Sequence, residues 1–158
     1  MTTHIAHIEW QRAEAPDAEA FRRGRFSRAH RWQFDGGVEL PASPSPEVIR
    51  PPWSDPAGVD PEEAFVASIA SCHMMSFLFV VSRAGYEVLS YNDEAVGTLG
   101  KNAEGRRWIE RVVLHPSIEW VPGHEPAAAE LSALHQAAHE ECYIANSVTT
   151  AVEIAADL

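Results

Sequence analysis

The chain has 158 residues, a length typical of one domain that buries its own core without metal or disulfide staples. Acidic residues outnumber basic ones by 23 to 12 and give a formal net charge of −11, which argues against a protein that grips nucleic acid phosphates. Two cysteines, Cys72 and Cys142, are too few for a disulfide scaffold and too distant for a CxxC motif, but they suffice for one redox pair.

The N-terminal part of the chain favours strands and turns. His4–Gln11 alternates loosely and predicts a strand, and the Ala-rich stretch Ala13–Ala20 predicts a loop. Arg25–Phe34 alternates more strictly and predicts a second strand. Asp35–Gly37 is a turn signal, after which Val38–Leu40 begins a partner strand.

A proline-rich loop and a long helix follow. Pro41–Pro56 contains six prolines, which favours an extended surface loop. Asp60 is a plausible N-cap, Pro61 fits the first helical position, and Glu63 occupies the capping-box position. A helix that starts here and ends at Gly85 places Cys72 near its middle.

A stretch without charges inside this helix calls for a test of membrane insertion. Ala64–Val81 has 18 residues and no formal charge, which approaches the length needed to span a bilayer. The stretch nevertheless contains three serines and one histidine, and charged residues bound it closely on both sides. We therefore expect a buried core helix of a soluble protein. The first residues show no secretory signal pattern, so the expected location is the cytoplasm.

The C-terminal half predicts a hairpin, a helix and a closing strand. Val88–Leu99 and Trp108–Val121 are strand candidates joined by a short Gly-containing connection. Pro126 opens a second helix with apolar residues at three- and four-residue steps, Cys142 among them. Ser147–Ile154 is rich in β-branched residues and predicts a strand. This order of elements indicates an α+β fold in one domain, residues 1–158, with one cysteine in each helix.

Each cysteine alone is compatible with a small buried hydrophobe, because reactivity requires a nearby cation, a helix N-terminus or hydrogen-bond donors. Five arginines lie within ten positions: Arg22, Arg23, Arg25, Arg28 and Arg31. The cluster is compatible with a solvated strand face. Strand alternation, however, places Arg28 among aromatic residues, which is an unusual position for a guanidinium without a partner.

Two segments around the cysteines carry a family resemblance. Val59–His73, read as VDPEEAFVASIASCH, closely resembles the first-cysteine segment of the OsmC-like family, which includes the organic hydroperoxide resistance proteins. Leu134–Ser147 resembles the second-cysteine segment of that family. Tyr143 and His73 differ from the residues usual in hydroperoxide resistance proteins, which places the chain nearer the broader OsmC-like group.

The resemblance implies a thiol-dependent peroxidase for organic hydroperoxides in oxidative-stress defence. Cys72 would be the peroxidatic cysteine and Cys142 the resolving one, forming an intramolecular disulfide. Glu62 would orient an arginine that activates the Cys72 thiolate, and that arginine would be Arg28 or Arg25. The family also implies an intertwined homodimer with active sites at the subunit interface. Since the sequence contains no cofactor fingerprint, electrons would come from an external dithiol, of lipoyl type in this family.

The position of Glu62 raises a geometric problem. Ten residues of straight helix separate Glu62 from Cys72 by about 15 Å, which is too far for one arginine to contact both. Either the helix starts later than Asp60 suggests, or the glutamate acts across a subunit boundary.

Two alternatives remain at this point. His135, His139 and Cys142 are spaced to lie on one helical face, and with Cys72 and His73 they could bind zinc. Alternatively, the protein could keep the fold without catalysis and hold a small ligand in an apolar cavity.

Overall fold

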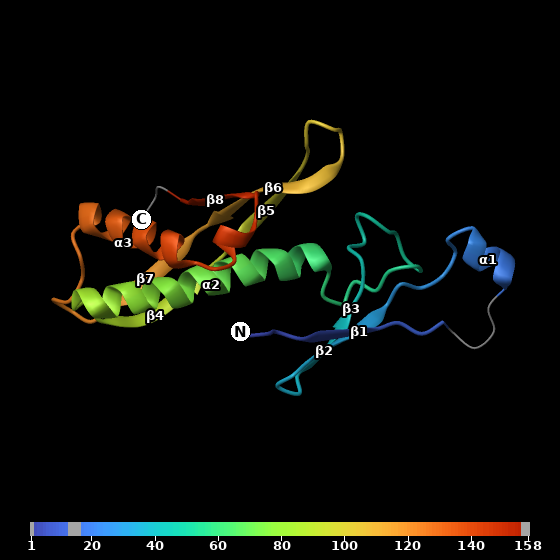
Figure 1. Ribbon diagram of the computed structural model, residues 1–158, viewed down its shortest axis with the longest axis horizontal. Helices are drawn as coiled ribbons and strands as arrows, with labels where there is room; N and C mark the ends of the chain where they lie inside the picture. Colours follow the sequence, from blue (N-terminus) through green and yellow to red (C-terminus); the bar gives the residue numbers. More distant parts are fainter. Residues whose placement is uncertain (1, 13–16, 156–158) are drawn as a thin grey trace. The chain divides into compact units, whose positions relative to one another are not determined.

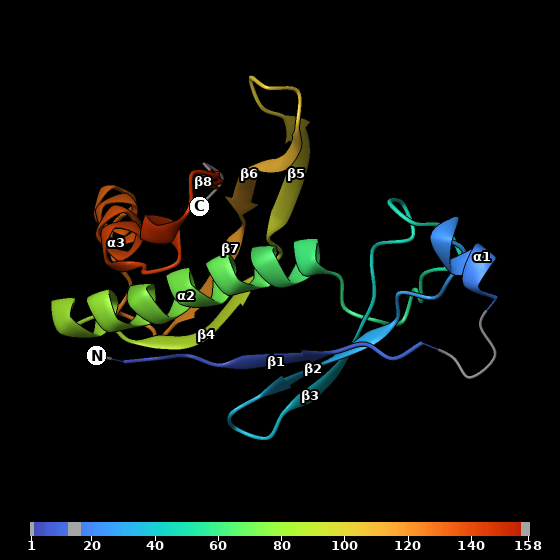
Figure 2. The ribbon, with the colours of Figure 1, turned by 45° about the vertical axis from the view of Figure 1, so that its right-hand side comes forward.

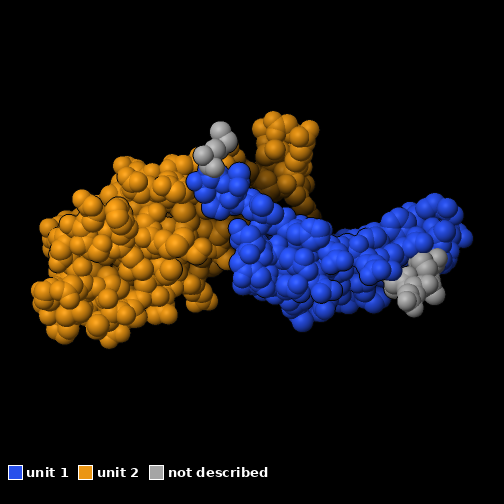
Figure 3. Space-filling model, turned by 60° about the horizontal axis from the view of Figure 1, so that its bottom comes forward, with its two compact units in different colours: residues 1–64 blue, residues 65–158 orange. Residues whose placement is uncertain are grey.

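The computed structural model describes residues 2–12 and 17–155, which fall into two compact units, residues 1–64 and residues 65–158 (Figures 1 and 3). The helices are α1 (Ala18–Arg22), α2 (Pro61–Ala84) and α3 (Ala128–Glu141), with a 3-10 turn, η1, at Ala145–Ser147. The strands are β1 (Ala6–Glu9), β2 (His30–Phe34), β3 (Glu39–Ala42), β4 (Val88–Asp93), β5 (Val96–Lys101), β6 (Arg107–Leu114), β7 (Pro116–Trp120) and β8 (Ala151–Ile154). The predicted α+β class is confirmed.

The first unit is built on the antiparallel sheet β1-β2-β3. The strand predicted over Arg25–Phe34 forms only from His30 onward, because the Arg28 backbone N–H already bonds the carbonyl of Trp53 in the following loop. The loop predicted over 13–20 is wrong at its end: α1 begins at Ala18, and the Asp17 side chain accepts from the Glu19 N–H at 2.8 Å. Residues 13–16 lie outside the described residues.

The loop predicted over Pro41–Pro56 begins later than predicted, because Pro41 and Ala42 belong to β3. From Ser43 to Pro56 the segment contains turns but no helix or strand, as predicted. Side-chain and backbone bonds hold its two ends together. The Ser43 hydroxyl accepts from the Asp55 N–H at 2.8 Å. Gly58 approaches β3 so closely that a Cβ there would lie 2.9 Å from the carbonyl carbon of Ala42.

Helix α2 has the predicted ends. The Glu63 N–H donates to the Asp60 carboxylate at 2.7 Å, and the Asp60 N–H donates to the Glu63 carboxylate at 3.1 Å, which completes a capping box. Gly85, at φ +88°, follows the last helical residue and permits the left-handed conformation that stops a helix. Cys72 therefore lies near the middle of α2, as predicted.

The prediction of a buried core helix holds for one face of α2 only in the single chain. Its fully buried residues are spaced four apart and lie on one face: Ile69, His73, Phe77 and Val81. On another face, Met75 and Phe79 are each 59% exposed. Among the described helices, α2 alone is long and apolar enough to span a membrane, by length and composition only. Its buried face and capped start instead indicate a helix of a folded domain.

In the second unit, the two predicted strands Val88–Leu99 and Trp108–Val121 form a long hairpin that is interrupted midway. β4 pairs with β7 and β5 pairs with β6, both antiparallel. At the interruption the Asp93 carboxylate accepts from the His115 N–H at 2.7 Å, and the His115 ring bonds the Glu94 carbonyl at 2.9 Å. These side-chain bonds replace the ladder and divide each predicted strand into two.

The last helix and the last strand are both shorter than predicted. Helix α3 begins at Ala128 rather than Pro126 and ends at Glu141, so Cys142 is its C-cap rather than an interior residue. The predicted strand Ser147–Ile154 is shortened to β8, which pairs with β6 in parallel. A parallel partner requires a crossover, and α3 lies on it.

Helix α2 spans two small sheets, as Figure 2 shows. Its N-terminal half packs through Ile69 against Val112 and Leu114 of β6. Its C-terminal half packs through Phe77 and Val81 against α3, β4 and β7. Gly97 allows the close approach, because a Cβ there would lie only 2.5 Å from the Val66 side chain of α2.

Candidate functional site

The two cysteines meet within the second unit. Cys72 lies midway along α2, and Cys142 caps the C-terminus of α3. Both are free thiols, and they lie close enough that each affects the ionisation of the other. The 69 residues between them therefore form the fold that brings two distant thiols close together.

The two thiols have different environments. Cys72 is half-buried, whereas Cys142 is fully buried. Burial and the nearby Cys72 thiol raise the pKa of the Cys142 thiol, although backbone N–H groups oppose the shift. One of these is the Ala145 N–H, which donates to the Cys142 sulfur at 3.4 Å. Cys72 is thus the more exposed of the two, while the raised pKa favours the protonated thiol at Cys142.

The structure removes one solution to the Glu62 problem. Because α2 starts at Pro61, Glu62 lies in its first turn, ten residues before Cys72. A helical rise of 1.5 Å per residue separates the two by about 15 Å. Among the described residues, Glu62 forms no ion pair with Arg28 or with any other cation. A later start of the helix is therefore excluded, and the orientation of an arginine by Glu62 at Cys72 stays a prediction.

Arg28 is fixed in place within the first unit. Its guanidinium donates to the carbonyls of Phe26 at 3.1 Å and Gly24 at 3.2 Å. It also lies over the Phe26 ring, 4.3 Å from the ring centroid. The prediction that Arg28 lies beside aromatic residues is confirmed for Phe26. The sequence did not show what pairs with the Arg28 guanidinium, and the structure shows that two backbone carbonyls do. Arg25 is exposed by comparison.

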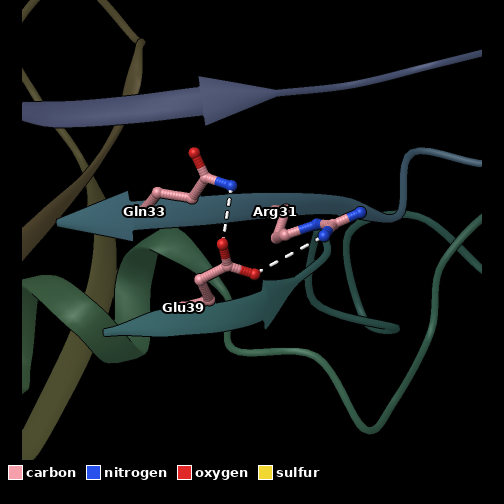
Figure 4. A network of polar contacts seen from close by, with 3 residues as sticks. All are labelled: Arg31, Gln33 and Glu39. Carbon is pink, nitrogen blue, oxygen red and sulfur yellow. Dashed lines mark hydrogen bonds and ion pairs between the residues drawn. The ribbon is translucent and has the colours of Figure 1, made fainter. Parts of the chain in front are cut away.

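Other arginines of the cluster are engaged with carboxylates at the surface. Figure 4 shows Arg31 on β2 paired with Glu39 on β3 at 3.5 Å, while Gln33 donates to the same carboxylate at 2.8 Å. Arg23 pairs with Glu19 one helical turn away. Arg31 and Arg23 therefore lie on a solvated surface, which was one of the two interpretations of the arginine cluster. Arg28 and Arg25 remain the two candidates for the arginine that activates Cys72.

A histidine pair, which the sequence did not predict, links α2 to α3 beside the thiols. His73 Nε2 and His135 Nδ1 lie 3.1 Å apart, and both residues are almost fully buried. Phe77 stacks on the His135 ring at a centroid distance of 4.2 Å. Burial lowers the pKa of each histidine to about 4, so both are neutral near pH 7. The sequence signal that could have placed His73 on the buried face is its four-residue spacing from Ile69 and Phe77.

The predicted zinc ligands are not assembled into a site. Within residues 2–12 and 17–155, no group of three or more His, Cys, Asp or Glu side chains is placed to hold a metal ion. Two of the candidate histidines use facing nitrogens to bond each other. The zinc hypothesis therefore has no support in the observed geometry.

Comparison with known proteins agrees with this arrangement. The family model described as OsmC-like protein matches residues 54–157. An OsmC-like protein of unknown function from Vibrio cholerae is 46% identical, with a TM-score of 0.91 over 98% of this chain and 99% of that chain. No curated protein sequence matches significantly.

Organic hydroperoxide resistance proteins share the fold at lower identity. The protein from Elizabethkingia anophelis is 18% identical, with a TM-score of 0.69 over 98% of this chain and 93% of that chain. The protein from Bacillus subtilis is 19% identical, with a TM-score of 0.66 over 97% of this chain and 96% of that chain. On the family match and the 46% identical structure, this chain belongs to the OsmC-like family.

Proposed function

We propose that the protein is a thiol-dependent peroxidase that reduces organic hydroperoxides in oxidative-stress defence. The observation that carries this proposal is the closeness of the two free thiols, one half-buried and one buried. The family includes organic hydroperoxide resistance proteins, whose fold this chain shares. The contact between thiols supports the two-cysteine route, in which a second thiol must lie within bonding range of the first.

The proposed reaction has three balanced steps. The Cys72 thiolate attacks one peroxide oxygen; the O–O bond breaks, and the alkoxide takes a proton to become an alcohol, which leaves Cys72 as a sulfenic acid. The Cys142 sulfur then displaces the sulfenic hydroxyl, which departs as water with the Cys142 proton, and a disulfide forms. An external dithiol, of lipoyl type by family resemblance, reduces this disulfide and is itself oxidised.

The burial of each thiol supports this order of events. Cys72 is the thiol that a substrate can reach, whereas Cys142 is fully buried and its pKa is raised. The Ala145 N–H would stabilise negative charge on the Cys142 sulfur as that sulfur becomes the nucleophile.

An arginine and Glu62 complete the proposed site. Arg28 has a fixed guanidinium, which suits a group that must stabilise both a thiolate and a developing alkoxide. We place Glu62 behind the arginine, in a site shared by two chains, because one chain separates Glu62 from Cys72 by about 15 Å. The functional domain would then be the whole chain, residues 1–158.

A homodimer supplies that second chain. Cys72, Met75 and Phe79 recur at helical spacing on α2, and the latter two are each 59% exposed, so they form an exposed apolar stripe. Large exposed apolar side chains beside a reactive residue favour burial by a partner subunit. The same stripe favours alkyl or fatty-acid hydroperoxides over hydrogen peroxide. Free thiols fit a reducing compartment, and we place the protein in the cytoplasm.

The decisive experiment measures peroxide consumption with dihydrolipoamide as reductant and cumene hydroperoxide or hydrogen peroxide as substrate. We expect rapid reduction of cumene hydroperoxide, no turnover in Cys72→Ser, and a single turnover per chain in Cys142→Ser with a sulfenic acid that dimedone traps. Full activity in Cys72→Ser would refute the proposed mechanism. Equal rates with the two peroxides would refute the substrate preference alone.

The two arginine candidates are separated by matched variants. Arg28→Ala should slow both peroxide reduction and alkylation of Cys72 by iodoacetamide, while Arg25→Ala should leave both rates near those of the parent. The reverse result would transfer the role to Arg25.

A further inference from the structure

The backbone of Arg28 lies outside the sheet of the first unit, because β2 begins two residues later at His30. Two contacts fix this backbone. The Arg28 N–H donates to the carbonyl of Trp53 at 3.0 Å, and the Arg28 carbonyl oxygen lies 2.8 Å from His30 Nδ1. The position from which the Arg28 side chain starts therefore depends on a histidine ring that the proposed function does not include.

The two partners of the His30 ring determine where its proton lies. The Trp32 indole Nε1–H donates to His30 Nε2 at 2.8 Å. An indole N–H can only donate and a carbonyl oxygen can only accept, so Nε2 must be unprotonated and Nδ1 must carry the proton. Both hydrogen bonds therefore exist together only when the ring is the neutral Nδ1–H tautomer.

The sheet in turn fixes Trp32. This residue lies two positions after His30 on the central strand β2, so the two side chains point to the same face. Its neighbours across the ladder are Ile8 on β1 and Leu40 on β3. A chain of contacts thus runs from the middle of the sheet through Trp32 and His30 to the Arg28 carbonyl.

The Arg28 guanidinium is oriented by acceptors from its own segment. The carbonyls of Phe26 and Gly24 accept from it, and both residues precede Arg28 by no more than four positions. These bonds orient the guanidinium relative to the local backbone, whereas His30 and Trp53 connect that backbone to the rest of the first unit. A guanidinium has more N–H groups than these two carbonyls use, so it can still donate to a ligand.

We propose that His30, held as its Nδ1–H tautomer by Trp32, is a positioning residue for Arg28. If Arg28 activates Cys72, on which the proposed function rests, then His30 contributes to peroxide reduction through Arg28. The positioning itself is a property of the first unit, and it can be measured without turnover.

Two substitutions of His30 separate its two hydrogen bonds. An asparagine amide nitrogen reaches about as far as Nδ1, so His30→Asn keeps a donor for the Arg28 carbonyl and loses the acceptor for Trp32. A glutamine amide oxygen reaches about as far as Nε2, so His30→Gln keeps the acceptor for Trp32 and loses the donor to Arg28. A role of His30 limited to packing predicts equal effects of the two substitutions.

The first measurement uses nuclear magnetic resonance on the full-length, ¹⁵N-labelled protein without substrate. At neutral pH, His30 should show a protonated Nδ1 and an unprotonated Nε2. Trp32→Phe should abolish this preference. Trp108→Phe, which removes an indole N–H that has no partner among the described residues, is the matched control and should preserve it. A protonated Nε2 in the parent would overturn the proposal.

The same spectra report on Arg28 directly. Its side-chain N–H signals, identified by their loss in Arg28→Ala, should persist in His30→Asn and broaden in His30→Gln. Broadening in both variants, or in neither, would overturn the proposal, because the bond to the Arg28 carbonyl would then not matter to the guanidinium.

The second measurement adds dihydrolipoamide and cumene hydroperoxide. His30→Gln should lower kcat/KM by about fivefold, the effect of one lost hydrogen bond between uncharged groups, and His30→Asn should stay near the parent value. In an Arg28→Ala background, His30→Gln should have no further effect, because His30 acts through Arg28. Additive losses would overturn the proposal. The expected Arg28 signals combined with unchanged rates would confirm the positioning and refute the role of Arg28 in the proposed peroxidase.

Discussion

Two faces of helix α2 both carry large apolar side chains but differ in what covers them. One face carries Ile69, His73, Phe77 and Val81, all buried by β4, β6, β7 or α3. The other carries Met75 and Phe79, which the single chain leaves exposed, in line with Cys72. The difference shows that apolar character alone does not identify a core. The buried face stabilises the fold, and the exposed face is the one that the proposed homodimer would cover.

The largest expected effect on stability comes from the buried face. Phe77→Ala should lower the free energy of unfolding by about 3–5 kcal/mol, because the ring is fully buried and its removal leaves a cavity between α2, α3 and the β4-β7 sheet. Urea unfolding followed by circular dichroism measures the change. Val48→Ala, at a loop position that is 48% exposed, is the control and should change stability by less than about 0.5 kcal/mol.

The histidine pair predicts how stability depends on pH. Burial lowers the folded-state pKa of His73 and His135 from 6.5 to about 4, so between these values the unfolded chain binds more protons. The contribution of the two histidines to the free energy of unfolding is therefore at its full value above pH 6.5, and it declines as the pH falls toward 4. The loss should be about 3 kcal/mol or more for the pair.

Urea titrations at pH 7.5, 6, 5 and 4.5 would measure this decline. The double variant His73→Phe/His135→Phe removes both partners together and should flatten it, whereas His7→Gln, at an exposed position of β1, should not. The same slope in the double variant as in the parent would assign the acid sensitivity to other groups.

The contact between α2 and β5 predicts a smaller effect. Gly97→Ala should destabilise the protein by about 1–3 kcal/mol, because the added Cβ would lie 2.5 Å from the Val66 side chain. Gly36→Ala adds a Cβ with no atom within 4 Å and is the matched control. The double variant Val66→Ala/Gly97→Ala should recover part of the loss in thermal unfolding, and no recovery would place the strain elsewhere.

The exposed face should contribute least to the fold of one chain and most to association. Phe79→Arg should leave the circular dichroism spectrum unchanged, because the residue is 59% exposed. In sedimentation the parent should be a dimer and the variant a monomer, and the variant should also lose peroxidase activity. A monomeric variant with full activity would contradict the shared site.

Local signals in the sequence predicted much of the architecture. The start of α2 was predicted because Asp60 and Glu63 bond each other's backbone over a single turn. The interruption of the long hairpin was not predicted, because it depends on Asp93 meeting His115 from a distant strand. Cys142 was predicted inside a helix because apolar spacing continues past Glu141, where the helix ends.

The sequence by itself determined the α+β class, the helix that holds Cys72 and the family to which the chain belongs, because capping, periodicity and motif spacing are local properties. Only the tertiary structure decided which face of α2 is covered, that Cys72 meets Cys142, and that His73 bonds His135. These results depend on contacts between residues 62 or 70 positions apart. The physical reason is that burial and hydrogen bonding are determined by what packs against a side chain, and that partner lies in another part of the sequence.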